Sequence, residues 1–336
     1  MNDKVKFEIT TWTIVKLFLV AAGFYFLYLV RDIVALVFIV LILVSTFSPV
    51  IKSWQQTIGR LASIFLLVLL VVASLVGVFY IIIPPLVNQI SELALSLPDY
   101  IANTNFSALR NYTSEIKSGL QSLSSNLGSV TSNIYSFTAG LIGGVFTLLM
   151  IFVLTFYILL DEDDVKRFIS SIFAPEHKEA AVGVINKIAS KIGSWFRGQL
   201  LLGLVIFVID YIGLSIIGIP YALVLALIAG ILEIVPTVGP IIAGITAALF
   251  ALTISPWKAL FVLIYYFAVQ LVENNVLVPK IMQKAVGISP AVIIIAILIG
   301  AKLMGVVGAI LAIPLAASVS VLILEWPTIN KIFSKE

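Results

Sequence analysis

The chain has 336 residues, of which 61% are hydrophobic and 11% are charged. Soluble domains carry about 25% charged residues, so this composition predicts an integral membrane protein and excludes a soluble enzyme. The net charge is +3, and no basic run is long enough to follow a phosphate backbone, which excludes a nucleic-acid binder. The chain has no cysteine and one histidine, so we expect no disulfide, no metal site and no cofactor.

Six apolar runs are long enough to form membrane-spanning helices, because about 20 apolar residues cross about 30 Å of hydrocarbon. The runs lie near 12–30, 33–51, 61–83, 139–160, 199–217 and 257–278. The first run has no small-residue cleavage site after it and is followed directly by the second, so we interpret it as a retained span. We expect residues 1–83 to form a scaffold of spans, and residues 139–160 to form the fourth span.

Lysine and arginine are distributed unevenly among the segments between these runs. Residues 161–198 contain six, namely Lys166, Arg167, Lys178, Lys187, Lys191 and Arg197. Residues 84–138 contain only Arg110 and Lys117. The positive-inside rule therefore places the N-terminus, the helical linker 161–198 and the tail 327–336 in the cytoplasm, and residues 84–138 outside.

The outside segment 84–138 shows a helical apolar pattern in two parts. One part follows Pro84 and Pro85, and the other follows residues 103–105 and repeats an apolar residue every third or fourth position. We expect two amphipathic helices. Their apolar stripe either packs on the membrane domain or the lipid surface, or forms a coiled-coil-like seam between subunits.

The last third of the chain contains an internal repeat, in which residues 218–245 align with residues 287–314. Matching positions include Gly218 with Gly287, Gly230 with Gly300, Gly239 with Gly308, and Ala243 with Ala312. Each unit, 199–256 and 257–326, has one full span followed by an apolar stretch that is interrupted in its middle. The positive-inside rule predicts that the two units cross the membrane in opposite directions.

The two interruptions predict helical hairpins with non-helical tips. Proline lacks a backbone donor and glycine loosens a helix, and the breaks contain Glu233, Pro236 and Gly239 in the first unit and Lys302, Gly305 and Gly308 in the second. The arms have about 11–16 residues, too few for a full crossing, which favours re-entrant hairpins. Inverted repeats with broken helices place substrate sites near the membrane midplane in many secondary transporters.

Polar residues at membrane depth are the candidate site residues. Glu233 is predicted to accept a proton or bind a cation, or alternatively to cap the broken helix or pair with Lys302. Gln270, Glu273 and Asn274 share one helix face and are predicted to point into the bundle, or alternatively to be solvated near the cytoplasmic end. Asp210 is expected to lie near the outer interface in a structural role.

Catalytic motifs are absent from the sequence. We find no His-Glu-x-x-His pair, no Gly-x-Ser-x-Gly elbow and no phosphate-binding glycine loop. We therefore do not expect an enzyme or an ATP-driven pump. Transport by this chain alone would use an ion gradient or the gradient of the solute.

The C-terminal half resembles the autoinducer-2 exporter family, whose members are also described as permeases of the PerM type. The resemblance is carried by Arg197-Gly-Gln199, Gly218-Ile-Pro220, Ile234-Val-Pro236-Thr-Val-Gly239-Pro240, Gln270, Glu273-Asn274-Asn275, Pro279-Lys-Ile-Met282, and Gly305 and Gly308 leading to Ile313-Pro314. The sequence departs from the family pattern at Ser289-Pro290, where many members have His-Pro, and at Lys302.

The resemblance implies an all-α, multi-pass protein of a prokaryotic inner membrane, with both termini cytoplasmic. Members are associated with export of autoinducer-2 or with exchange of sodium or lithium for protons, and homo-oligomers are expected. We predict about six full spans plus two hairpins, and export of a small polar solute by alternating access. The alternatives are a monovalent cation/proton antiporter and a membrane scaffold that does not transport.

Overall fold

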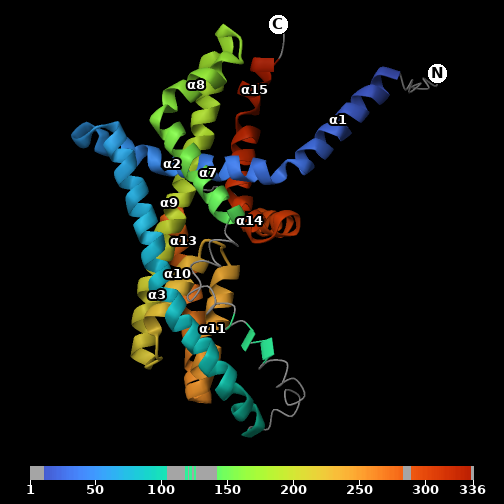
Figure 1. The fold of residues 1–336 in the computed structure, drawn as a ribbon. Helices are drawn as coiled ribbons and strands as arrows, with labels where there is room; N and C mark the ends of the chain where they lie inside the picture. The colour runs from blue at the N-terminus through green and yellow to red at the C-terminus, as the bar shows by residue number, and fades with distance from the viewer. Residues whose placement is uncertain are drawn as a thin grey trace, which may run out of the picture.

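The computed structural model describes residues 11–103, 118–119, 121–122, 125, 142–282 and 289–333. Every regular element assigned in these residues is helical (Figure 1). The all-helical prediction is therefore confirmed for the described part of the chain.

The N-terminal helices are α1 (Thr11–Leu29), α2 (Arg31–Ile58), α3 (Arg60–Asn103) and α7 (Ile142–Leu160). In Figure 1, α1 extends away from the rest of the molecule toward the N-terminus. Helix α2 packs against α3, α7 and α9. Its apolar side chains form one core with α3 and α7, around Val40, Ile64 and Leu159.

Helix α3 continues through Pro84 and Pro85 and ends at Asn103. The prediction that a separate amphipathic helix begins after these prolines is therefore wrong. Proline removes one backbone donor, but helices of membrane proteins tolerate this loss. The second amphipathic helix, predicted after residues 103–105, lies mostly outside the described residues.

The linker predicted at 161–198 does not form a separate unit. It contains α8 (Glu162–Ser171) and a short 3-10 turn (Pro175–His177), and then becomes the first half of α9 (Lys178–Ile217). Helix α9 has 40 residues and is about 60 Å long at 1.5 Å per residue. Its length is about twice the hydrocarbon thickness, so one rigid helix contains both the predicted linker and the predicted fifth span.

The first repeat unit continues with α10 (Ala222–Leu232) and α11 (Val238–Ile254). Helix α12 (Pro256–Val272) follows, then a π-helical turn (Glu273–Leu277) and α13 (Val278–Met282). Helices α9 to α12 share the largest apolar core of the described residues, which includes Leu202, Leu214, Ala229, Ala247 and Val262. These helices lie together in the lower part of Figure 1.

The chain ends in α14 (Pro290–Leu324) and α15 (Trp326–Phe333). Helix α14 is broken at Met304 and Gly305, which have non-helical backbone angles. Gly300 and Gly308 meet backbone to backbone on either side of the break, so the two parts of α14 fold back on each other as a hairpin. This hairpin packs mainly on α9.

Five helical segments of the described residues are long and apolar enough to cross a membrane: Arg31–Ile58, Arg60–Val78, Pro175–Ile217, Pro256–Met282 and Ala291–Leu324. The first four overlap predicted spans, and the fifth is the broken hairpin of α14. Helices α1 and α7, with 19 residues each, coincide with the first and fourth predicted spans. The count of six spans and the opposite orientation of the repeats remain predictions.

Candidate functional site

The first predicted break is confirmed as a tight turn between α10 and α11. Helix α10 ends at Leu232, and α11 begins at Val238. The backbone N–H of Val238 donates a hydrogen bond of 2.8 Å to the carbonyl oxygen of Pro236. Thr237 lies between them with φ 69° and ψ −45°, the geometry of a classic γ-turn, which is rare and strained. The tip of the first hairpin is therefore held in a costly backbone conformation.

Gly239 follows this turn at the point where the two arms approach each other. A Cβ atom there would collide with the backbone carbonyl group of Leu232. Gly308 makes a similarly close approach to the carbonyl group of Gly300 in the second hairpin. Both hairpins thus have a glycine where their arms meet, although the partner positions, Leu232 and Gly300, are not matched in the repeat.

Glu233 lies at the end of α10 and is completely buried, with 0% of its surface exposed. Among the described residues, neither of its carboxyl oxygens has a hydrogen-bond partner. Glu233 stands at the C-cap position of α10, but its carboxyl group makes no capping hydrogen bond. Lys302 is exposed, and the ion pairs of the described residues do not include a Glu233–Lys302 pair. A buried charge without a partner costs several kcal/mol, so the site suits a proton or another mobile ligand.

The backbone at Glu233 is fixed more firmly than its side chain. The buried side-chain amide of Gln199 in α9 donates a hydrogen bond to the carbonyl oxygen of Glu233. One turn further along α9, Gly203 lies against Gly230 of α10, and a Cβ at either glycine would come within 2.6 Å of the other carbonyl oxygen. The two glycines let the backbones of α9 and α10 touch, which positions Glu233 against α9.

Two more buried carboxyl groups are close enough to interact electrostatically with Glu233. They belong to Glu273, at the start of the π-helical turn, and Asp210 in α9, and their exposed fractions are 3% and 0%. Within the described ranges, no group of three acidic or histidine side chains is placed to hold one metal ion. The three carboxyl groups are therefore not gathered around a single metal ion in the described residues.

The predicted polar face on α12 is only partly oriented into the bundle. Glu273 is buried, Gln270 is half-buried and Asn274 is exposed. The side-chain amide of Gln270 donates to the side-chain oxygen of Asn274 at 3.3 Å, and solvation of this pair near the cytoplasmic end remains the alternative prediction. The π-helical turn begins at Glu273, and such turns are frequent at functional sites.

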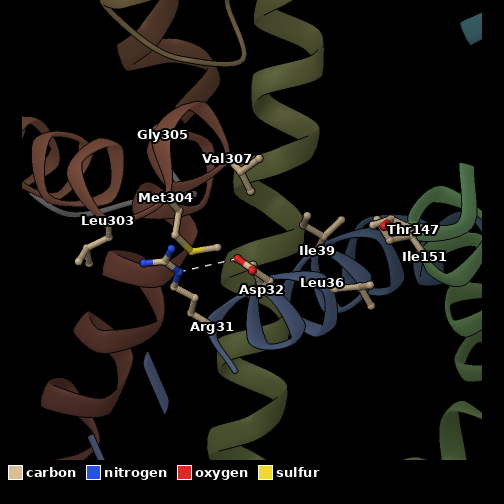
Figure 2. Close-up of a pocket in the computed structure, with 11 residues that line it drawn as sticks. Arg31, Asp32, Leu36, Ile39, Thr147, Ile151, Leu303, Met304, Gly305 and Val307 are labelled. Atoms are coloured by element: carbon tan, nitrogen blue, oxygen red, sulfur yellow. Dashed lines mark ion pairs between the residues drawn. The ribbon is translucent and has the colours of Figure 1, made fainter. Parts of the chain in front are cut away.

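The second predicted break, at Met304 and Gly305, borders a cavity of about 530 Å³. Its walls come from α2, α7 and α14, and include Arg31, Asp32 and Thr147. Figure 2 shows Arg31 and Asp32 at the start of α2 reaching toward Met304. The Arg31 Nε and Asp32 Oδ1 atoms are 3.9 Å apart. This cavity brings a guanidinium, a carboxylate and a hydroxyl group to the second hairpin tip.

The structure separates the predicted site residues into two groups. Glu233, Pro236 and Gly239 lie at or next to the first tip, whereas Gly305 borders the cavity at the second tip. Glu273 is buried in the turn that follows α12 and influences Glu233 electrostatically. Lys302 is exposed and does not line that cavity. The sequence argument missed the contact of Gln199 with Glu233, and it assigned Asp210 a structural role near the membrane surface. The position of Asp210 inside an apolar stretch was the sequence signal that could have indicated its burial.

Comparison with known proteins identifies relatives over most of the chain. YrrI of Bacillus subtilis strain 168, named as a candidate transport protein, is 28% identical over 300 residues, covering 86% of this chain and 85% of YrrI. PerM of Escherichia coli strain K12, named as a candidate permease, is 23% identical over 302 residues, covering 88% of this chain and 78% of PerM. Residues 17–328 match the sequence profile described as AI-2E family transporter. The chain therefore belongs to the AI-2E family of transporters.

Proposed function

We propose that this transporter exports a small polar solute of the autoinducer-2 type by alternating access, and that Glu233 binds the proton that drives it. One observation carries the proposal: Glu233 is fully buried at the tip of a broken hairpin, and no described residue bonds its carboxyl oxygens. A carboxyl group at membrane depth usually marks an ion or substrate path. Membership of the AI-2E family supports transport as the activity.

The proposed solute site is the cavity beside the second hairpin tip. Arg31 provides donors and Asp32 provides acceptors at its edge. The break at Met304 and Gly305 interrupts the helical hydrogen-bond ladder, so backbone polar groups there are available to a hydroxyl-rich ligand. The cavity volume of about 530 Å³ falls in the usual range for small-molecule sites.

The two hairpins are linked through the turn that follows Glu233. Val235, at the first tip, packs on a core formed by Trp195 of α9 with Ile297 and Ile313 of α14. A displacement of the second hairpin relative to α9 would therefore reach the turn that holds Glu233. We propose that this contact couples occupancy of the solute cavity to protonation of the first hairpin.

Reconstitution of the purified protein into liposomes tests the proposal. The experiment follows radiolabelled autoinducer-2 across the membrane with and without an imposed pH gradient, using protein-free liposomes as the control. The proposal predicts solute movement in the direction opposite to the imposed proton flow. Solute movement that is the same with and without the gradient would contradict proton coupling, and absence of movement under both conditions would contradict this substrate.

A monovalent cation/proton antiporter is the second candidate. It is favoured by the three buried acidic residues, which have no ion pair with a basic side chain among the described residues. Liposomes without any organic solute distinguish the two functions. An antiporter converts an imposed sodium gradient into a pH gradient, whereas the proposed solute exporter does not.

A further inference from the structure

Asp210 lies in the apolar half of α9 and is completely enclosed. Its exposed fraction is 0%, and neither carboxyl oxygen has a hydrogen-bond partner among the described residues. A carboxyl group in such surroundings takes up a proton or a cation, because an isolated charge is very costly there. The burial is unexpected for a residue predicted to lie near the membrane surface.

Two consecutive tyrosines of α12, Tyr265 and Tyr266, lie beside Asp210. The hydroxyl group of Tyr265 donates a hydrogen bond of 2.7 Å to the carbonyl oxygen of Ile209. The hydroxyl group of Tyr266 is buried and has no partner within the described ranges. A phenol can donate to a carboxylate and can also accept from a carboxylic acid, so Tyr266 can serve either form of Asp210.

Two glycines create the space for these tyrosines. A Cβ atom on Gly213 of α9 would overlap the ring of Tyr265, and a Cβ atom on Gly244 of α11 would lie 3.2 Å from the ring of Tyr266. Three helices therefore contribute to the surroundings of Asp210, namely α9, α11 and α12. The two glycines and the two tyrosines pack together and help to enclose Asp210.

The titratable groups of the described residues that influence Asp210 are two phenols and one carboxyl group, from Tyr265, Tyr266 and Glu273. Glu233 is influenced in turn by Asp210 and Glu273. The Glu233 side chain lies against α9 at Gly203, where a Cβ would be 3.7 Å from Glu233 Cβ. Asp210 is seven positions further along α9, or about 10 Å at 1.5 Å per residue.

We propose that Asp210, assisted by Tyr266, is a second proton-binding site of this protein, in series with Glu273 and Glu233. The inference rests on the proposed function, in which protons cross the protein. An O–H bond forms on the Asp210 carboxylate when a proton arrives and breaks when the proton leaves, so the charge of the site changes by one and nothing is oxidised or reduced. Asp210 would give the proton a binding site that is distinct from the hairpin tip.

Infrared difference spectroscopy of the whole protein in lipid tests the proposal without any transport assay. Spectra are recorded across a pH titration for the wild type and for Asp210→Asn, Glu233→Gln and Tyr266→Phe, and the probe is the proton itself. We expect Asp210→Asn and Glu233→Gln each to remove a different carboxylic acid C=O band. Tyr266→Phe keeps the ring in place and should shift only the band that Asp210→Asn removes.

Each outcome of these titrations either supports or overturns the assignment of Asp210 as a second proton-binding site. A wild-type spectrum in Asp210→Asn would overturn the proposal, as would a Tyr266→Phe spectrum in which the Asp210 band does not move. A band that disappears with sodium chloride but persists with choline chloride would show a cation site and would also overturn it. If the Asp210 band is present while no pH-driven solute flux is found, the second proton site stands and the proposed transport function fails.

Discussion

The side-chain amide of Gln199 holds the backbone carbonyl oxygen of Glu233, and this bond joins α9 to the tip of the first hairpin. Both residues are buried, with exposed fractions of 3% and 0%. The hydrogen bond therefore sets the depth of the carboxyl group while leaving its two oxygens unbonded. Glu233 is held in place by its backbone, and its side chain remains available to a ligand.

Replacing Gln199 with leucine removes the only described donor to the Glu233 carbonyl oxygen. A buried acceptor left without a partner costs about 1–3 kcal/mol, so Gln199→Leu should lower the free energy of unfolding by that amount. Thermal unfolding in detergent measures the effect. Asn186→Leu, at an exposed position of the same helix, is the matched control. Equal melting temperatures for the two variants would contradict the role of Gln199.

Gly203 should tolerate no side chain, because a Cβ there would lie 2.5 Å from the carbonyl oxygen of Gly230. Overpacking of this kind costs about 1–3 kcal/mol, so Gly203→Ala should lower the melting temperature and separate α10 from α9. Gly183 in the same helix has no atom within 4 Å of the added Cβ. Gly183→Ala should therefore stabilise α9 by up to about 1 kcal/mol. Effects of the same sign in both variants would refute the close helix approach.

Arg197 compensates for a proline in α2. Pro49 has no N–H, so the carbonyl oxygen of Ser45 lacks its helical donor. Arg197 Nη1 donates instead to the carbonyl oxygens of Ser45 and Thr46, at 3.1 and 3.0 Å. Charged hydrogen bonds contribute about 1.5–3 kcal/mol, so Arg197→Met should lower the free energy of unfolding by that amount, as measured by thermal unfolding in detergent. Adding Pro49→Ala should recover part of this loss of stability. If the effects of the two substitutions on stability are strictly additive in the double variant, the compensation is disproved.

Thr237 is a β-branched residue with a positive φ of 69°. Such a conformation costs about 1–3 kcal/mol, and glycine adopts it without strain. Thr237→Gly should therefore unfold at a higher temperature than Thr237→Ala, which keeps the strain. The comparison is made by thermal unfolding in detergent, and an alanine variant at least as stable as the glycine variant would show that the turn is not strained.

The positions of the hairpin breaks could be predicted from the sequence because their causes are local. Pro236, Gly239 and Gly305 disrupt the helix at or next to their own positions. The continuity of α9 was harder to predict, because the basic composition of residues 161–198 indicated a cytoplasmic helical linker separate from the span that begins at residue 199. No proline occurs between Lys178 and Gly218, so nothing there ends the helix.

The surroundings of Glu233 could not be predicted in the same way. Gln199 is 34 positions away in the sequence, and its contact depends on how closely α9 approaches α10 through Gly203 and Gly230. The burial of Asp210 likewise depends on the packing of two tyrosines from α12. The π-helical turn at Glu273–Leu277 could not be predicted either, because the expected spacing assumed a regular α-helix.

Solute flux through liposomes that contain Glu233→Gln is the most direct test of the central claim. The substitution keeps the shape of the side chain and removes its ability to exchange a proton. We predict that exchange of labelled for unlabelled solute continues, while flux driven by a pH gradient falls to the level of protein-free liposomes. Glu179→Gln, at an exposed position, should behave as the wild type. Unchanged pH-driven flux in Glu233→Gln would contradict the account.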